Sequence, residues 1–153
     1  MLRGSLKISS TAKPTQKQKD VIISHRIARM ATVDELGNPL VLPVCFVYCG
    51  GFIYSPIDNK PKGVSADKLK RVRNINQNPN ISLVLDKYFE NWSKLYYVII
   101  TGRALVIYSG DEYQKSLKIL TEKYDQYRKM GLERLGAPVI KITPEKIISW
   151  GDI

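Results

Sequence analysis

Short apolar runs separated by turn residues predict a chain built mainly from β-strands. Runs rich in β-branched and aromatic residues, bounded by Gly, Pro, Asn or Asp, are typical of strands. The runs that fit are residues 27–33, 40–48, 52–55, 81–85, 96–107, 139–142 and 146–150. Turn-forming residues separate several of them, and the last two runs flank residues 143–145, around which we expect them to pair. We therefore expect about six strands.

Two of these strands have features that constrain their place in a sheet. The run 40–48 is apolar on both faces, which is expected where one face fills a core and the other is covered by a partner subunit or a bound ring. Pro43 cannot donate to a ladder, so the strand is expected to be interrupted or to lie at an edge there. Gly102 marks a bend within the run 96–107.

Helical spacing occurs at the start of the chain and again near its end. The first helix is expected over residues 15–24, with Thr15 as its N-cap. The longest helix is expected from Glu112 to about Met130, because apolar side chains recur there at spacings of three and four. Residues 131–138 are expected to form a loop.

A further helix is expected between the strands at 52–55 and 81–85. Ser65 or Asp67 can cap its first turn, and Asn78-Pro79 ends it, since a residue before proline is pushed out of the helical region. Most cationic side chains of this segment fall in the preceding loop or off the predicted apolar stripe. They are Lys60, Lys62, Lys70, Arg71 and Arg73.

Strands in meander order with helices inserted between them favour a mainly β (α+β) fold, a small antiparallel barrel with flanking helices. A doubly wound sheet is not favoured, because strands and helices do not alternate throughout. At 153 residues the chain is long enough for one core. We expect residues 1–14 to be a flexible N-terminal segment and residues 15–153 to form a single domain.

Composition favours a cytoplasmic protein without metal or disulfide. No apolar run reaches the ~20 residues of a membrane helix, and residues 1–8 lack the apolar core of a signal peptide. Cys45 and Cys49 lie on one predicted strand and its turn, which cannot bring them together. With His25 as the single histidine, a metal site within the chain is not expected, and the thiols are expected to be buried and reduced.

The net charge of +10 is concentrated in two segments. Residues 1–30 carry seven Lys/Arg against one Asp, a net +6, and residues 60–79 carry six against one Asp, a net +5. Residues 31–59 net −3 and residues 80–153 net +2. This clustering favours an anionic ligand over an evenly solvated basic surface.

No catalytic triad, glycine-rich phosphate loop or metal constellation is visible, so a cofactor is expected to carry any chemistry. A phosphate-bearing cofactor suits the central segment. Lys60, Lys62, Lys70 and Arg71 could converge on one phosphate, with the hydroxyl of Ser55 as a further donor. The strand 40–48 would then face a flat ring. The alternative is a basic helix face that is merely solvated.

Several segments, in their order and spacing, resemble the FMN-binding split-barrel superfamily of the pyridoxamine phosphate oxidases. The resemblance spans about residues 25–151 and is carried by ATVDELGNPLVLPVCFVY, IYSPIDNKPK, LKRVRNINQNPNISLVLDKY, DEYQKSLKILTEKY and a terminal tryptophan. The closest branch is that of small proteins assigned to the deazaflavin cofactor F420. The resemblance implies a six-stranded antiparallel split barrel.

The resemblance also implies a homodimer that binds FMN or F420 at two interfacial sites, each built from both chains. Phosphate-binding positions of the family match Lys60, Lys62, Lys70 and Arg71. Positions beside the ring match Leu42, Pro43, Val44, Tyr54, Ser55 and Trp150. The oxidases carry an arginine where this chain has Leu42, so true pyridoxamine phosphate oxidase activity is not expected. No protein residue is assigned a catalytic role.

We therefore hypothesise a flavin- or deazaflavin-dependent oxidoreductase that transfers hydride to or from a small conjugated substrate. A cofactor-binding carrier or sensor without turnover is the first alternative. A nucleic-acid-binding basic module is a remote one, because cations and aromatics do not alternate on one strand face as stacking platforms require. The sequence leaves FMN and F420 undecided.

Overall fold

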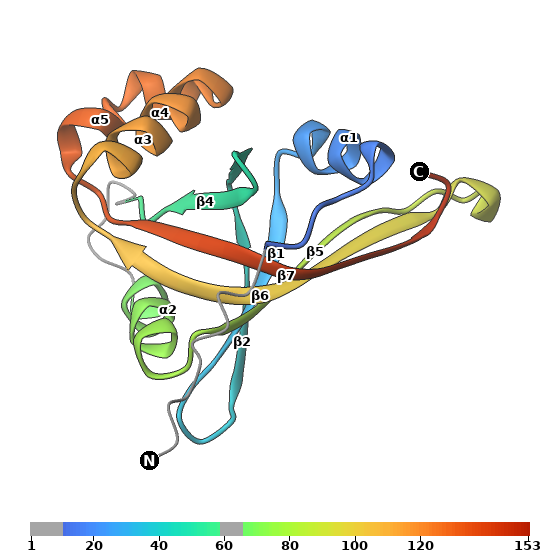
Figure 1. The fold of residues 1–153 in the computed structure, drawn as a ribbon, viewed down its shortest axis with the longest axis horizontal. Coiled ribbons are helices and arrows are strands. Elements are labelled where there is room, and N and C mark those ends of the chain that lie inside the picture. The colour runs from blue at the N-terminus through green and yellow to red at the C-terminus, as the bar shows by residue number, and fades with distance from the viewer. Residues whose placement is uncertain (1–10, 59–65) are drawn as a thin grey trace, which may run out of the picture.

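The computed structural model describes residues 11–58 and 66–153, with residues 66–69 described by their backbone alone (Figure 1). Seven strands and six helical segments follow one another along these ranges. They are α1 (Gln16–Ser24), β1 (Ala28–Val33), β2 (Pro39–Val44), β3 (Val47–Cys49), β4 (Phe52–Pro56), α2 (Ala66–Gln77), β5 (Asn80–Lys87), the 3-10 helix η1 (Trp92–Lys94), β6 (Tyr96–Ile107), α3 (Asp111–Lys123), α4 (Asp125–Lys129), α5 (Leu132–Leu135) and β7 (Val139–Gly151).

All seven strands belong to one antiparallel sheet in the order β2-β1-β5-β6-β7-β4-β3. The two edge strands, β2 and β3, are consecutive in sequence and are joined by only two residues, Cys45 and Phe46. The ends of the two strands, Val44 and Val47, are three Cα–Cα steps apart and lie within about 11 Å of each other, so the sheet must curl until its edges approach each other. The result is a half-barrel, which Figure 1 shows as a strongly bent sheet.

The two faces of the sheet are covered by different elements. The concave inner face buries one apolar core, to which Ile22 of α1 and Ile75 of α2 contribute together with inward-facing strand residues. A second core lies on the outer face of β3, β4 and the start of β7, under the layer of α3, α4 and α5. In the part of the chain that the structure describes, no helix lies on the rest of the outer face, over β2, β1, β5, β6 and the second half of β7 (Figure 1).

The predicted fold class is confirmed, and two local predictions are confirmed with it. Thr15 caps α1 through a capping box with Gln18. Pro43 lies on an edge strand, where its missing N–H leaves no gap in a ladder. The structure has seven strands where about six were expected. The predicted meander order is wrong at two places, because β1 pairs with β5 and β4 pairs with β7.

The predicted strand 40–48 and the predicted helix 112–130 are each broken by the same tertiary contact. The hydroxyl of Tyr124 bonds the backbone N–H of Phe46 at 3.0 Å and its carbonyl at 2.8 Å, so these groups do not enter a ladder. Tyr124 itself adopts extended backbone angles and separates α3 from α4. The apolar spacing continues through Tyr127 into the buried layer, so it could not predict the break.

The predicted loop 131–138 contains the short helix α5, which lies between two glycines of positive φ, Gly131 and Gly136. The predicted pair of closing strands is instead one strand, β7, which runs through residues 143–145 with an irregularity opposite Thr101 and Gly102. A bulge accommodates Pro144 without an unmet ladder bond. Gly102 is required there, because a Cβ atom would lie 2.0 Å from the carbonyl oxygen of Thr143.

The structure tests only part of the predictions about the N-terminal segment and about membrane helices. Residues 1–10 lie outside the described ranges, whereas Ala12 donates its N–H to the carbonyl of Pro144 at 2.8 Å. Among the described residues, no helix has the length and apolar character needed to cross a bilayer.

Candidate functional site

The strongest candidate for ligand binding is the guanidinium group of Arg71 on α2. Arg71 is 5% exposed, and its Nε donor has no hydrogen-bond partner among the described residues. Burial lowers its pKa, while the neighbouring Asp58 and then Tyr127 act in the opposite direction. An unpaired donor of a buried cation is costly, so this side chain fits an anion better than it fits a role in apolar packing.

The burial of Arg71 corrects the sequence interpretation, which placed this side chain off the buried stripe of its helix. Asn74 and Ile75 follow it at spacings of three and four, and both are buried. Residues at these spacings share one helix face. The true buried stripe of α2 therefore passes through Arg71, and the helix turns its cation toward the protein interior.

Asp58 and Tyr127 are the two ionisable groups that oppose the effect of burial on Arg71, and they are bonded to each other. Asp58 follows the end of β4, and Tyr127 lies on α4 with 5% of its surface exposed. The Tyr127 hydroxyl donates to Oδ2 of Asp58 at 3.1 Å. Burial raises the pKa of Tyr127, with Cys45 and Asp58 adding to the effect, so this hydroxyl keeps its proton and remains a donor.

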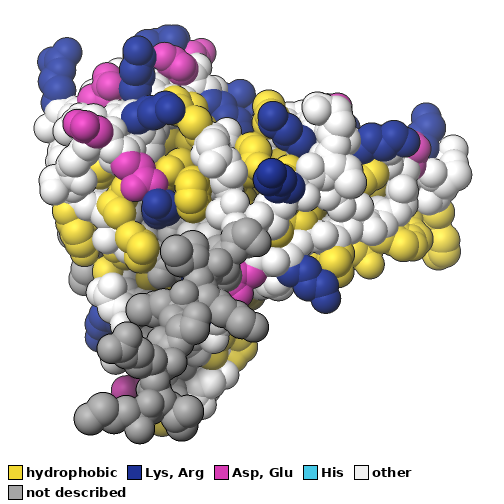
Figure 2. Space-filling view, viewed as in Figure 1, with side chains coloured by type: hydrophobic (Ala, Val, Ile, Leu, Met, Phe, Trp, Pro, Cys, Tyr) yellow, Lys and Arg dark blue, Asp and Glu magenta, His cyan; other side chains and the backbone are white. Residues whose placement is uncertain are grey.

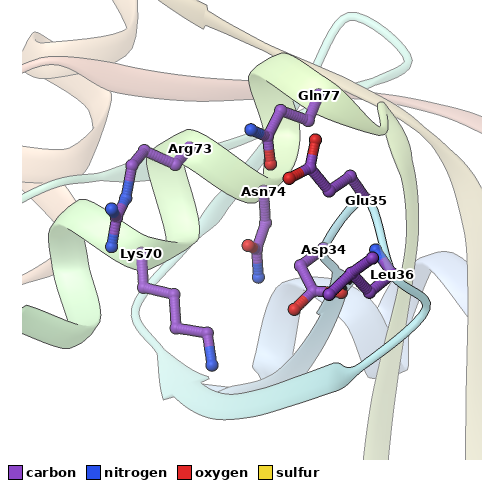
Figure 3. Close-up of a pocket in the computed structure, with 7 residues that line it drawn as sticks. All are labelled: Asp34, Glu35, Leu36, Lys70, Arg73, Asn74 and Gln77. Carbon is purple, nitrogen blue, oxygen red and sulfur yellow. Dashed lines mark hydrogen bonds between the residues drawn. The ribbon is translucent and has the colours of Figure 1, made fainter.

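Lys70, the sequence neighbour of Arg71, lies in a different environment. It lines a polar hollow of about 220 Å³ between α2 and the β1–β2 turn, together with Arg73, Asn74, Gln77, Asp34, Glu35 and Leu36 (Figure 3). The hollow combines two cations with two carboxylates, which lowers its attraction for an anion. The convergence of Lys70 and Arg71 on one phosphate stays a prediction.

The hydroxyls of Tyr54 and Ser55 on β4 are engaged within the chain. The Tyr54 hydroxyl donates to Oε1 of Glu112 at 2.7 Å, and Lys141 pairs with the same oxygen at 2.6 Å. Lys141 and Tyr54 hold the pKa of Glu112 below its usual value, and burial followed by Glu112 raises the pKa of Tyr54. The Ser55 hydroxyl donates to the carbonyl of Cys45 at 2.7 Å.

The three consecutive residues of β2 do not face the same side. Val44 is 5% exposed and packs in the inner core, and Leu42 faces inward beside Met30. Pro43 is exposed and points to the uncovered outer face. Because strand side chains alternate, only one of the three side chains can meet a ring on that face.

Trp150 lies far from Ser55 in the same chain. Its ring stacks on Tyr97, with centroids 5.7 Å apart and planes at 20°. Ser55 pairs with Ile140 of β7, ten residues before Trp150 on that strand. Ten strand residues span roughly 33 Å. Trp150 and Ser55 of one chain therefore cannot enclose the same ring.

Lys60 and Lys62 lie outside the described residues, so their predicted phosphate contacts stay predictions. Within the described ranges, no group of three or more His, Cys, Asp or Glu side chains is arranged to hold a metal ion. Cys45 and Cys49 are free thiols, as expected, but both are half-buried where full burial was expected.

Sequence reasoning missed Asp58 and Tyr127 as neighbours of Arg71. Asp58 is the single carboxylate between the end of the strand 52–55 and Asp67. Its position directly before the predicted cationic cluster could have indicated that Asp58 acts on one of those cations. Tyr127 continues the apolar spacing of its helix, so nothing local marked its hydroxyl as functional. It comes near Arg71 only because the helical layer folds back over β4.

Comparison with known proteins identifies relatives over nearly the whole chain. A family profile described as "Pyridoxamine 5'-phosphate oxidase" matches residues 14–151. No protein with a curated description matches in sequence.

Solved structures share the fold at low sequence identity. The conserved hypothetical protein Rv2991 from Mycobacterium tuberculosis is 19% identical with a TM-score of 0.67, covering 92% of this chain and 86% of that one. The heme storage protein HutZ from Vibrio cholerae is 16% identical with a TM-score of 0.68, covering 86% and 91%. A FAD-binding protein from Mesorhizobium loti is 17% identical with a TM-score of 0.65, covering 90% and 94%. At these identities the likeness establishes the fold alone.

Proposed function

Because this chain belongs to the pyridoxamine 5'-phosphate oxidase family of FMN-binding split barrels, we propose that it is an oxidoreductase that binds FMN or the deazaflavin F420. The observation that carries the proposal is the buried Arg71, whose Nε donor has no partner among the described residues. A phosphoryl group would supply the missing acceptor, and its charge would offset the cost of burying the guanidinium.

The residues present fit the phosphate end of such a cofactor. Arg71 would hold the phosphoryl group, with Lys60, Lys62 and Lys70 as further cationic groups. Pro43 would lie against the ring, with the backbone of Val44 and the end of β4 at its edge. A bound flavin or deazaflavin supplies the hydride chemistry. The protein contributes position and electrostatics, and Leu42 replaces the arginine of the oxidases, which argues against pyridoxamine phosphate as substrate.

The proposed site also requires a second copy of the chain. Trp150 can meet a ring beside Ser55 only from another copy, because one chain holds it roughly 33 Å away from Ser55 along β7. The uncovered outer face offers an apolar row across five paired strands, interrupted by Arg29. The row consists of Pro43, Arg29, Val84, Ile99 and Ile148. We define these five residues as the outer-face row.

The exposure and charge of the side chains on this face suit its burial against the same face of a second copy. Ile148 is 42% exposed. Val41, which lies two residues before Pro43 on β2 and faces the same side, is 59% exposed. Arg29 pairs with Asp86 on the same face, so the charge within the row is already compensated. Hydrophobic side chains also follow one edge of the arm that carries β5 and β6 in Figure 2. A self-complementary pairing of two such faces is the simplest arrangement that covers them.

Direct titration tests the proposed cofactor. We expect the purified protein to bind FMN or F420 in the micromolar range or tighter at one cofactor per chain, measured by quenching of cofactor fluorescence. Riboflavin, which has the same ring as FMN but no phosphate, serves as the control and should bind at least tenfold more weakly. A folded protein that binds neither phosphorylated cofactor at micromolar concentration would exclude the proposal.

Ile148→Glu is expected to separate the two copies. A carboxylate in the middle of an apolar interface loses its hydration without gaining a partner, so the dimer should weaken by at least tenfold. Light scattering across a concentration series measures the change. Ile23→Glu is the matched control, because Ile23 is similarly exposed, at 51%, but lies on α1. A variant that stays as dimeric as the wild type would contradict the assigned interface.

A carrier or sensor without turnover is the second candidate function. It uses the same site, and it differs only in that the bound cofactor is neither reduced nor oxidised by small substrates. Spectra of the loaded protein recorded with candidate substrates distinguish the two functions.

A further inference from the structure

The polar hollow between α2 and the β1–β2 turn holds charges of both signs that do not pair with one another. Lys70 and Arg73 come from α2, and Asp34 and Glu35 come from the turn. Figure 3 shows the two cations on one side of the hollow and the two carboxylates on the other. Among the residues that the structure describes, no ion pair joins these four groups. The hollow therefore has a cationic side and an anionic side.

We propose that the polar hollow binds a small zwitterion, an amino-carboxylate of the size of an α-amino acid. The carboxylate of the ligand would meet Lys70 and Arg73, and its ammonium group would meet Asp34 and Glu35. A zwitterion matches both sides at once, whereas a simple anion or a simple cation is attracted by one side and repelled by the other. The volume of about 220 Å³, the liquid volume of roughly seven water molecules, limits the ligand to this size.

The helical wall of the hollow is one face of α2. Lys70, Arg73, Asn74 and Gln77 recur at spacings of three and four, which places their side chains on the same helix face. Arg71, the proposed phosphate ligand, is about 100° further around the helix than Lys70 and does not line the hollow. The proposed zwitterion site is thus separate from that ligand, and it goes beyond the proposed function.

Asn74 gives the hollow a fixed polar group between its two charged sides. This side chain lines the hollow, although only 2% of its surface is exposed. Its Nδ2 donates to Oγ1 of the buried Thr32 at 3.1 Å, which holds the amide in place. No described residue donates to its Oδ1. This oxygen is therefore an acceptor that the hollow can offer to an ammonium group.

The β1–β2 turn fixes the anionic side before any ligand arrives. Oδ1 of Asp34 accepts from the backbone N–H groups of Leu36 at 2.9 Å and Asn38 at 2.8 Å, and Oδ2 accepts from Nδ2 of Asn38 at 3.0 Å. These bonds, led by the one from the Asn38 side chain, lower the pKa of Asp34, so its carboxylate stays ionised. A charge held in this way loses little freedom when a ligand binds.

Isothermal titration with L-amino acids tests the proposal. The protein is used without added cofactor, so that the outcome does not depend on the proposed function. We expect at least one standard L-amino acid with an uncharged side chain to bind with a Kd below about 1 mM. Its α-amide, which is only a cation, and its N-acetyl derivative, which is only an anion, should each bind at least about tenfold more weakly. Binding of none of these amino acids, or equal binding of either derivative, would overturn the proposal.

Arg73→Gln and Glu35→Gln test the location of the site, because each removes one charge from one side of the hollow. Both residues are exposed and neither belongs to the proposed cofactor site, whereas Lys70 is shared with it. Each variant should bind the amino acid at least about fivefold more weakly than the wild type does. Relative to the amino acid, the amide should gain in Arg73→Gln and the N-acetyl derivative should gain in Glu35→Gln, since the balance of charge shifts in opposite directions.

Lys118→Gln and Glu122→Gln are the matched controls, because they make the same two charge changes at exposed positions of α3. Both should keep the affinities of the wild type for all three ligands. Losses as large as those of the hollow variants would show an effect of net charge and overturn the assigned site. A shift of selectivity in the same direction in Arg73→Gln and Glu35→Gln would overturn it too. Failure of FMN and F420 to bind would defeat the proposed function alone.

Discussion

Arg71→Met is expected to weaken binding of the phosphorylated cofactor by about 10- to 150-fold, while leaving riboflavin binding almost unchanged. Methionine keeps much of the length of the side chain but cannot donate a hydrogen bond. A charge-assisted hydrogen bond to phosphate contributes about 1.5–3 kcal/mol, which corresponds to this range. Isothermal titration with FMN and F420 measures the loss.

The cofactor-free Arg71→Met variant should be about as stable as the wild type. Replacing a buried charged group by an apolar side chain of similar volume is often neutral or stabilising. The matched control is Arg73→Met, which removes the same charge from an exposed position two residues along α2. Equal losses of affinity in the two variants would show that the effect is one of net charge, and the assignment of Arg71 as the phosphate ligand would then be wrong.

Stability is expected to rise with pH between about 8 and 9.5 because of Lys123 at the end of α3. Its Nζ donates to the carbonyls of His25 at 2.7 Å and Phe46 at 3.0 Å, and lies 4.3 Å from the centre of the Phe46 ring. Burial, followed by the nearby Arg26, lowers the pKa of Lys123 from 10.5 to about 8. The folded protein therefore releases this proton at lower pH than the unfolded chain does.

The sign of the effect follows from proton linkage. Between pH 8 and 10.5 the unfolded state binds more protons at this position, so the free energy of unfolding increases with pH, and below pH 8 this contribution is flat. The full difference would be about 3 kcal/mol, and partial exposure of Lys123 reduces it to about 2 kcal/mol. Above pH 10 the trend reverses, because burial raises the pKa of Tyr124 to about 12 and the unfolded state loses that proton first.

Urea unfolding at pH 7, 8, 9 and 9.5 measures this dependence. Lys123→Met should remove most of the rise, whereas Lys118→Met, an exposed lysine on the same helix, should keep it. The slopes of Lys123→Met and the wild type should therefore differ, and identical slopes would contradict the assigned burial of this amine.

Local patterns were sufficient for much of the architecture. The capping residues around Thr15 and the Pro43 position each depend on neighbours within a few residues, and both predictions were confirmed. The basic segment that contains Arg71 was also recognisable from composition. These features are encoded locally, because steric and hydrogen-bonding preferences of adjacent residues determine them.

The pairing of distant segments was decided only by the tertiary structure. The bonds of Tyr124 to Phe46 broke a predicted strand and a predicted helix at once, although the apolar spacing ran through both breaks. The side of α2 that is buried, and hence the burial of Arg71, depends on how the helix packs against the half-barrel.

The sequence by itself determined a strand-rich, cationic chain with the motifs of its family. Only the folded chain decided that Arg71 is buried with an Nε donor that finds no partner among the described residues, and that Trp150 lies at the opposite end of β7 from Ile140, the residue paired with Ser55. The physical reason is that hydrophobic periodicity specifies which residues avoid water, whereas long-range packing and hydrogen bonds specify which of them meet.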